Sequence, residues 1–222
     1  MPRRFSDDLR AAAADVWEHQ YQHPFIRGLA DGSLPLERFA HFMRQDYVFL
    51  VEYARMLALG AARARDLPTM RRYADIAQAT LGEEMELHRA FARDVGISEA
   101  ELEAEPPALT TQAYTDFLVR TAALGDAADL AAALLPCMWG YSELGQRLQA
   151  DGPPDHEHYA RWIAAYAAPE FEALAAWCRA HVDTLAADDA TRARMTSAFV
   201  TCSRYELAFW EMAWTLERWP TG

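Results

Sequence analysis

A long segment of the chain, residues 35–65, has the sequence PLERFAHFMRQDYVFLVEYARMLALGAARAR. Its apolar residues recur at spacings of three, four and seven, which is the period of one face of an α-helix. Pro35 suits the first position of a helix, because its backbone angle is already helical and a missing N–H costs nothing there. The segment therefore predicts a helix from Pro35 to about Arg65.

The same apolar spacing continues over almost the whole chain, whereas runs of β-branched residues and Asn-Gly turns are missing. We therefore expect an all-α helical bundle whose antiparallel neighbours are joined by short loops. No low-complexity linker and no internal repeat divides the sequence, so a single domain over residues 1–222 is expected. The other expected helices cover residues 6–22, 24–30, 68–96, a short segment after Ser98, 110–125, 127–150, 155–167, 169–186 and 189–218.

Several helix starts carry a capping signal. Ser6 is the expected N-cap of the first helix, and Thr110 or Thr111 that of the helix ending at Gly125. Ser98 and Glu101 have the spacing of a capping box. Pro136 falls inside a helical pattern, where it cannot donate its backbone hydrogen bond, so the helix is expected to kink or start afresh.

Composition and charge exclude several classes of protein. The chain has 222 residues, 52% of them hydrophobic, and a formal net charge of −12. Nucleic-acid binding is not expected, because it needs a basic face that displaces counterions from phosphates. No apolar run approaches 18 residues, so no membrane association through a spanning helix is expected.

Three cysteines, Cys137, Cys178 and Cys202, are widely spaced and form no CxxC pair. Neither a disulfide framework nor a zinc ribbon is therefore expected. Reduced thiols indicate a cytoplasmic protein, and the first ten residues have no apolar run of a signal peptide.

Two carboxylates lie on apolar helix faces, where an ionisable group is unusual. They are Asp46 and Glu206. Each is either a buried structural hydrogen-bonding group or a functional acid, and both alternatives stay open at this point. Their neighbours three and four residues away are Phe42, Met43, Phe49 and Leu50 for the first, and Cys202, Ser203, Phe209 and Trp210 for the second.

Cys137 directly follows Pro136, and Tyr141 shares its helix face one turn further on. A lone cysteine is usually a small buried hydrophobic residue. Cys137 differs because a proline at a helix kink leaves backbone groups unpaired and a cavity forms easily beside it. Tyr114 and Tyr166 align with apolar neighbours, and spacing alone favours a core position for both.

Glu84 and His88 are one helical turn apart, so they could bind a metal ion together or make a hydrogen bond in the core. A helical bundle with two metal ions usually carries Glu-x-x-His pairs on several helices. No Glu-x-x-His spacing occurs in the sequence. We therefore expect no metal site.

Five groups of motifs, in this order along the chain, resemble the TenA/thiaminase II family in its cysteine-containing branch. The resemblance extends from about residue 15 to residue 219. The motifs are HPF at 23–25 with DGSLP at 31–35, QDY at 45–47, EEMELHR at 83–89, LLPC at 134–137 with Trp139 and Tyr141, and YE at 205–206 followed by FWEMA at 209–213.

The resemblance implies a heme-oxygenase-like helical fold that needs no heme, metal or other cofactor, and it implies a homotetramer. It also implies a hydrolase that converts 4-amino-5-aminomethyl-2-methylpyrimidine to the hydroxymethyl pyrimidine and ammonia. Thiamin would be a second, slower substrate, and the pathway would be thiamin synthesis and salvage.

Carried over by position, the resemblance makes Cys137 the nucleophile and Glu206 the proton donor. Asp46 and Tyr141 match positions that hold the pyrimidine, and Tyr114 and Tyr166 match tyrosines of the binding pocket. Phe49 departs from the family, which often has a tyrosine there that assists the cysteine. Either a water molecule or the hydroxyl group of Tyr47 replaces it, or the thiol is less strongly activated.

Two alternative functions remain on the same helical scaffold. One is a metal-dependent oxidase, for which the sequence lacks clusters of histidine and glutamate. The other is a non-catalytic module that binds pyrimidines or regulates another protein. A nucleophile, a proton donor and a ring-binding carboxylate together favour the hydrolase, because binding alone needs no nucleophile.

Overall fold

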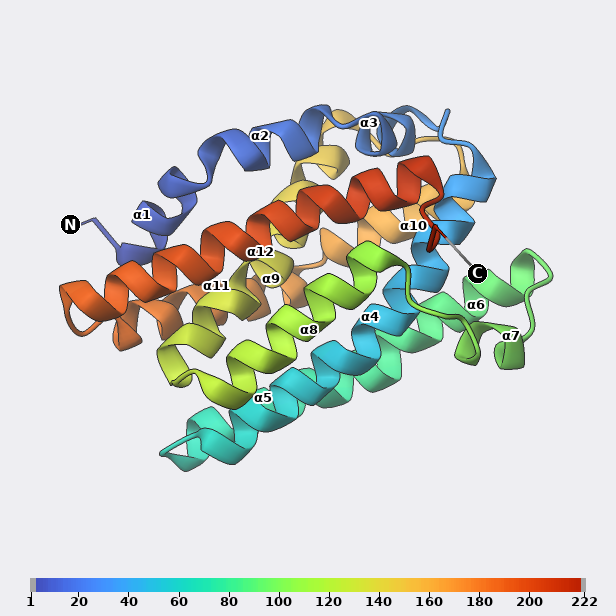
Figure 1. Ribbon diagram of the computed structural model, residues 1–222. Coiled ribbons are helices and arrows are strands. Elements are labelled where there is room, and N and C mark those ends of the chain that lie inside the picture. The colour runs from blue at the N-terminus through green and yellow to red at the C-terminus, as the bar shows by residue number, and fades with distance from the viewer. Residues whose placement is uncertain (1–2, 221–222) are drawn as a thin grey trace. The chain divides into compact units, whose positions relative to one another are not determined.

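The computed structural model describes residues 3–220, and over that range it contains helices and no strand (Figure 1). The predicted all-α class is confirmed. The helices are α1 (Phe5–Ala12), α2 (Ala14–Gln22), α3 (Pro24–Asp31), α4 (Leu36–Arg63), α5 (Leu67–Ala79), the π-helical turn η1 (Thr80–Glu84), α6 (Met85–Asp94), α7 (Glu99–Glu103), α8 (Leu109–Leu124), α9 (Ala127–Asp151), α10 (Glu157–Tyr166), α11 (Pro169–Leu185) and α12 (Asp189–Thr215).

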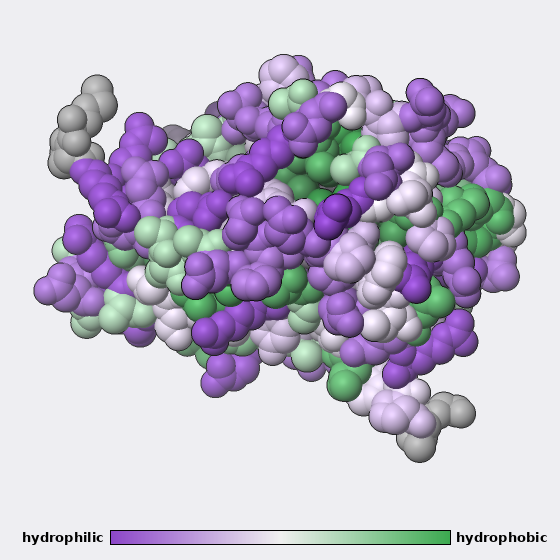
Figure 2. All heavy atoms as spheres, turned by 90° about the horizontal axis from the view of Figure 1, so that it is seen from above, coloured by the Kyte–Doolittle hydropathy of each residue, from purple (hydrophilic) through white to green (hydrophobic). Residues whose placement is uncertain are grey.

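The helices form two compact units. Over the described residues, the first comprises 3–34 together with Ala128–Glu211, and the second comprises Pro35–Ala127 together with 212–220. The single domain expected over residues 1–222 stays a prediction. Figure 2 shows hydrophilic side chains over most of the face it presents, as expected for a chain with 24% charged residues.

In the first unit, α1 packs on α11. Ser6 is buried inside α1, and its backbone N–H and hydroxyl donate to the two carboxylate oxygens of Asp183 at 2.7 and 3.2 Å. The expected cap at Ser6 is therefore wrong, because its hydroxyl binds α11, and the N-cap is Arg4. The helix expected over residues 6–22 is also interrupted, at Ala13.

Helix α9 runs through Pro136 without a fresh start. Pro136 and the preceding residues 131–135 are buried, and packing holds the helix together although Pro136 cannot donate to the preceding turn. Further along α9, Gly145 lets α10 approach very closely. A Cβ atom on Gly145 would lie 2.6 Å from the carbonyl carbon of Tyr166.

In the second unit, α4 packs against α5, α6 and α8. The buried Gln45 on α4 accepts from the backbone N–H of Ala108 at 2.7 Å and from the hydroxyl of Thr111 at 2.8 Å. The expected cap of α8 at Thr110 or Thr111 is therefore wrong, because the helix already begins at Leu109 after Ala108. A distant side chain, Gln45, satisfies this helix start.

The segment expected to be one helix over residues 68–96 is divided by η1, where the backbone widens to π-helical hydrogen bonding over Thr80–Glu84. Such turns are frequent at functional sites. The capping box is confirmed, because the hydroxyl of Ser98 accepts from the N–H of Glu101 while the Glu101 carboxylate accepts from the N–H of Ser98.

The helices between residues 3 and 220 include none with both the length and the apolar character needed to span a membrane.

Gly145→Ala should destabilise the protein, although alanine favours helices over glycine by about 1 kcal/mol. The added methyl group meets backbone atoms of Tyr166 and Ala167 at 2.6 and 2.8 Å, so α10 must shift. We expect the free energy of unfolding to fall by about 1–3 kcal/mol, the usual cost of overpacking. Urea unfolding measures the change.

Gly140→Ala on the same helix is the matched control. Its Cβ would lie 3.9 Å from the nearest atom of Trp17, an ordinary contact. This variant should be neutral, or more stable by up to about 1 kcal/mol. Equal stabilities of the two variants would contradict the close approach at Gly145.

Candidate active site

Cys137 and Tyr141 lie one turn apart on α9 in the first unit. Cys137 is partly buried, whereas Cys178 and Cys202 are buried, and no disulfide joins any of the three. Cys178 and Cys202 therefore match the interpretation of small core residues. Cys137 is therefore the most accessible of the three thiols, and a nucleophilic thiol must be accessible to its substrate.

Aromatic rings from two other helices, α10 and α12, surround Tyr141. The ring centroid of Tyr166 on α10 lies 5.0 Å from that of Tyr141, and the centroid of Trp210 on α12 lies 5.3 Å away. Trp162 on α10 lies 5.9 Å from Tyr141 and 4.6 Å from Tyr166. The fold thus brings the predicted residues Tyr141 and Tyr166 together in one cluster of flat side chains.

Glu206 is buried on α12, only 3% exposed, and shares a helix face with Trp210 one turn on. The indole N–H of Trp210 donates to the side-chain oxygen of Gln20 at 3.2 Å, and the Gln20 amide donates to the Ser203 carbonyl at 3.4 Å. The indole of Trp17 donates to the Ser203 hydroxyl at 2.9 Å.

Gln20 orients Trp210, and the sequence analysis missed this residue. Its only signal in the sequence is a polar side chain three residues after Trp17, on the face that α2 buries. Glutamine is common on helix surfaces, so its presence at this position does not indicate a partner. The sequence therefore could not predict the hydrogen bond from Gln20 to Trp210 on α12.

Asp46 is buried on α4 in the second unit and is 4% exposed. Its Oδ2 lies 2.8 Å from Nε2 of His88 on α6, and Nδ1 of His88 lies 2.8 Å from the carbonyl oxygen of Glu84. Of the two alternatives for Glu84 and His88, the structure shows the core hydrogen bond. Within residues 3–220, no group of three or more His, Cys, Asp or Glu residues could hold a metal ion.

The pKa of His88 is raised above its ordinary value of 6.5. Complete burial by itself lowers this pKa, since it disfavours the charged form. The hydrogen bond and negative charge of Asp46, together with the Glu84 carbonyl, outweigh burial. The pair therefore favours a protonated imidazole beside a carboxylate.

Phe49 and Tyr114, both buried, lie with their ring centroids 5.0 Å apart, and Tyr53 lies 5.4 Å from Phe49. The hydroxyl of Tyr47 accepts from the guanidinium of Arg89 at 3.1 Å. This hydroxyl accepts from Arg89 and keeps its own proton to donate, so Tyr47 stays one of the alternatives for the hydroxyl missing at Phe49.

The predicted site residues thus fall into two sets. The first unit holds a thiol, a buried carboxyl group and an aromatic cluster, and the second holds a buried carboxylate with an imidazole partner and two aromatic rings. The first set is Cys137, Glu206, Tyr141 and Tyr166, and the second is Asp46, Phe49 and Tyr114.

The class of protein can be identified from the helical fold. A domain from Shewanella denitrificans, described as having a heme oxygenase-like fold, matches with a TM-score of 0.75 at 14% identity and covers 95% of this chain and 92% of its own. The predicted fold class is confirmed. The model of the TENA/THI-4/PQQC family matches residues 10–216, and this chain belongs to that family.

Relatives over nearly the whole length carry an enzyme name. A protein of Halalkalibacterium halodurans named aminopyrimidine aminohydrolase is 44% identical over 97% of each chain. Its namesake in Bacillus subtilis is 40% identical over 97% of this chain and 92% of its own. A solved TenA homologue from P. horikoshii OT3 has a TM-score of 0.90 at 30% identity and covers 96% of this chain and 99% of its own. The predicted family is confirmed.

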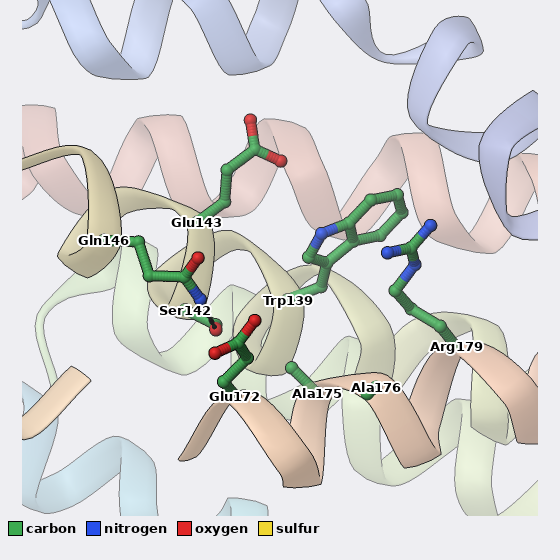
Figure 3. A pocket seen from close by; sticks show the side chains of 8 residues that line it. All are labelled: Trp139, Ser142, Glu143, Gln146, Glu172, Ala175, Ala176 and Arg179. Carbon is green, nitrogen blue, oxygen red and sulfur yellow. Dashed lines mark hydrogen bonds between the residues drawn. The ribbon is translucent and has the colours of Figure 1, made fainter. Parts of the chain in front are cut away.

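A cavity of about 140 Å³ lies between α9 and α11 of the first unit (Figure 3). Its α9 residues are about half a turn around the helix from Cys137 and Tyr141, at 100° per residue. This cavity therefore lies away from the predicted nucleophile. Its lining residues are Trp139, Ser142, Glu143, Gln146, Glu172, Ala175, Ala176 and Arg179.

Glu143, at the edge of this cavity, accepts from Arg10 at 3.1 Å and from Arg147 at 2.8 Å. Burial raises the pKa of Glu143, but the two guanidinium groups and the hydroxyl of Tyr21 outweigh burial and leave the pKa below its ordinary 4.5. Burial and the Glu143 charge raise the pKa of Tyr21. Glu143 therefore stabilises the fold as a carboxylate that ties α1 to α9.

Glu143→Gln should lower the free energy of unfolding at pH 7 by on the order of 1–2 kcal/mol. A lowered pKa in the folded state stabilises the protein above the ordinary pKa, and this contribution disappears as the pH falls through the folded-state value. The difference between variant and wild type should therefore shrink below about pH 4. Urea unfolding at pH 7 and at pH 3.5 measures it.

Glu172→Gln, at the exposed side of the same cavity, is the control and should change stability little at either pH. A difference for Glu143→Gln that stays constant with pH would contradict the assigned role of the charge.

Proposed function

We propose that this chain is an aminopyrimidine aminohydrolase that uses Cys137 as a nucleophile. The observation that carries the proposal is the 44% identity, over 97% of both chains, to a relative with that name. The partly buried thiol of Cys137 and the buried carboxyl group of Glu206 in one compact unit support it.

The proposed reaction is hydrolysis of 4-amino-5-aminomethyl-2-methylpyrimidine to the 5-hydroxymethyl pyrimidine and ammonia. Thiamin, whose pyrimidine carries a thiazolium on the same methylene carbon, is the second candidate substrate and would give the same alcohol. Both reactions would serve thiamin salvage. The aromatic cluster around Tyr141 supports a flat ligand, because rings stack favourably on one another.

The chemistry needs covalent catalysis. The leaving amine sits on a methylene carbon attached to an electron-rich ring, where direct displacement by water is slow. The thiolate of Cys137 adds to the ring carbon next to the one that bears the methylene, and the electron pair released into the ring then expels the amine and leaves an exocyclic C=C bond. Water adds to the exposed methylene, the C–S bond breaks, and the thiolate returns. One difficult step is thus divided into easier ones.

Two protons move during this sequence. Glu206 donates one to the departing amine and takes one from the attacking water, so it ends the cycle in its starting state. Glu206 is 3% exposed, so bulk water does not compete with it for the proton it passes to the amine. Asp46 accepts from the amino group or a protonated nitrogen of the pyrimidine, which withdraws electrons from the ring and favours thiolate addition.

Phe49 distinguishes this chain from family members with a tyrosine at that position. Because Phe49 has no hydroxyl, we propose that either a water molecule or the hydroxyl of Tyr47, which accepts from Arg89 and keeps its own proton, takes this role. Weaker activation of the thiol is the alternative.

The homotetramer and the cytoplasmic location also belong to the proposal. The tetramer is supported by the family resemblance, and the location by three cysteines outside disulfides. Release of ammonia from the aminomethyl pyrimidine distinguishes the hydrolase from a pyrimidine-binding module. Oxygen uptake and metal content of the purified protein would identify the metal-dependent oxidase.

Cys137→Ser should lose nearly all turnover while still binding the pyrimidine, because a hydroxyl group fills the same space but is a far weaker nucleophile at neutral pH. Ammonia release measures turnover, and calorimetry measures binding. Cys178→Ser, at a buried cysteine on α11, is the control and should keep its activity. Wild-type rates for Cys137→Ser would remove the covalent step.

Glu206→Gln should reduce kcat by roughly 10²- to 10⁴-fold, the usual contribution of a general acid–base group. The amide keeps the shape of the side chain but cannot carry the proton. Glu172→Gln, on the exposed surface of α11, is the matched control and should leave kcat unchanged. A loss below tenfold for Glu206→Gln would contradict its role as proton donor.

A further inference from the structure

The protonation state of His88 follows from the atoms at its two ring nitrogens. Nδ1 lies 2.8 Å from the carbonyl oxygen of Glu84, and Nε2 lies 2.8 Å from Oδ2 of Asp46. A carbonyl oxygen can only accept a hydrogen bond, so Nδ1 must carry a proton. An ionised carboxylate can also only accept, so Nε2 must then carry a second proton.

Water hardly reaches this pair. His88 is 0% exposed and Asp46 is 4% exposed. Buried opposite charges persist only as a pair with well-formed hydrogen bonds, because either charge alone would be strongly disfavoured. The π-helical turn η1 ends at Glu84, which provides the carbonyl at the second nitrogen. Both nitrogens of the ring are thus satisfied.

We propose that His88 is a positioning residue, held as an imidazolium between the Glu84 carbonyl and Asp46, which keeps the Asp46 carboxylate ionised and oriented for the pyrimidine. This inference rests on the proposed function, which assigns Asp46 to the substrate. Oδ2 is held by His88, so Oδ1 is the oxygen available to a ligand. An ionised carboxylate is needed there, because it must accept from the amino group or a protonated ring nitrogen.

The charged groups around the pair agree with this assignment. Asp46 on α4 and Glu84 at the end of η1 both favour a protonated His88, and the pKa of His88 is raised as a result. Arg89, next to His88 on α6, is engaged by Tyr47 and by Glu99 of α7, at 3.1 and 3.2 Å. Its other carboxylate contact is Glu86 at 3.7 Å.

Nitrogen NMR of the wild-type protein labelled with ¹⁵N-histidine tests the protonation state directly. We expect both ring nitrogens of His88 to show the shifts of protonated imidazolium from pH 5 to pH 8. The resonances are assigned by substituting the other six of the seven histidines in turn. An unprotonated Nε2 at pH 8 would overturn the proposal, because the shared proton would then belong to Asp46 or be absent.

Kinetics of His88→Gln test the positioning role. Glutamine can place an amide donor near Oδ2 but carries no charge, so Asp46 loses the cation that favours its ionised form. The acidic limb of the kcat/KM profile should move to higher pH, because an opposite charge close to a carboxyl group favours its ionised form. kcat/KM should fall by roughly 10- to 100-fold at pH 6 and less at pH 8.

His88→Leu removes the donor as well as the charge, so its loss of kcat/KM should exceed that of His88→Gln at pH 8. A purely structural His88 would lower the melting temperature and the active fraction without moving the pH profile, and that result would overturn the proposal. His19→Gln is the matched control. Nδ1 of His19 contacts the carbonyl oxygen of Asp15 four residues earlier, as Nδ1 of His88 contacts Glu84, but the side chain is exposed.

Failure of the proposed function and failure of the role assigned to His88 would give different results. If the wild-type protein releases no ammonia from the aminomethyl pyrimidine or from thiamin, the proposed function fails, and the NMR result still decides the state of His88. If the wild type is active and the profile of His88→Gln is unshifted, the function stands and the role of His88 does not. Should neither His88 variant fold, the wild-type spectrum alone decides.

Discussion

Buried polar side chains must find partners, and this constraint organises the second unit around two adjacent residues of α4. Gln45, 1% exposed, accepts from Ala108 and Thr111 and donates to the Pro106 carbonyl at 3.0 Å. Asp46 binds His88. Leaving any of these groups unpaired would cost about 1–3 kcal/mol, and more for the charged pair. The start of α8 and the register of α6 against α4 both depend on these bonds.

The first unit meets the same constraint with indole and amide groups. Trp17 and Gln20 on α2 bind Ser203 and Trp210 on α12, and all four side chains are buried. These bonds fix how α12 is rotated about its own axis, and they therefore fix the direction in which the helix face with Glu206 points. The network thus orients the candidate proton donor, and through Trp210 it also holds one ring of the aromatic cluster around Tyr141.

Local signals in the sequence worked where the partner is also local. The capping box of Ser98 and Glu101 formed as expected, because both residues belong to the same helical turn. Ser6 and Thr110 failed as caps, since each hydroxyl binds a carboxylate from a distant part of the chain, Asp183 and Glu217 respectively. A hydroxyl group takes the strongest acceptor within reach, and packing decides which acceptor that is.

The sequence by itself determined that the chain is helical, where most helices lie, and which two carboxylates face an apolar interior. It did so because apolar periodicity and the position of a charge on a helix face are properties of local spacing. Tertiary structure alone decided that Asp46 faces His88, whose helix position 42 residues away has no spacing relation to it. It also decided that Gln20 holds Trp210, since contacts between helices depend on how whole faces pack and not on any one segment.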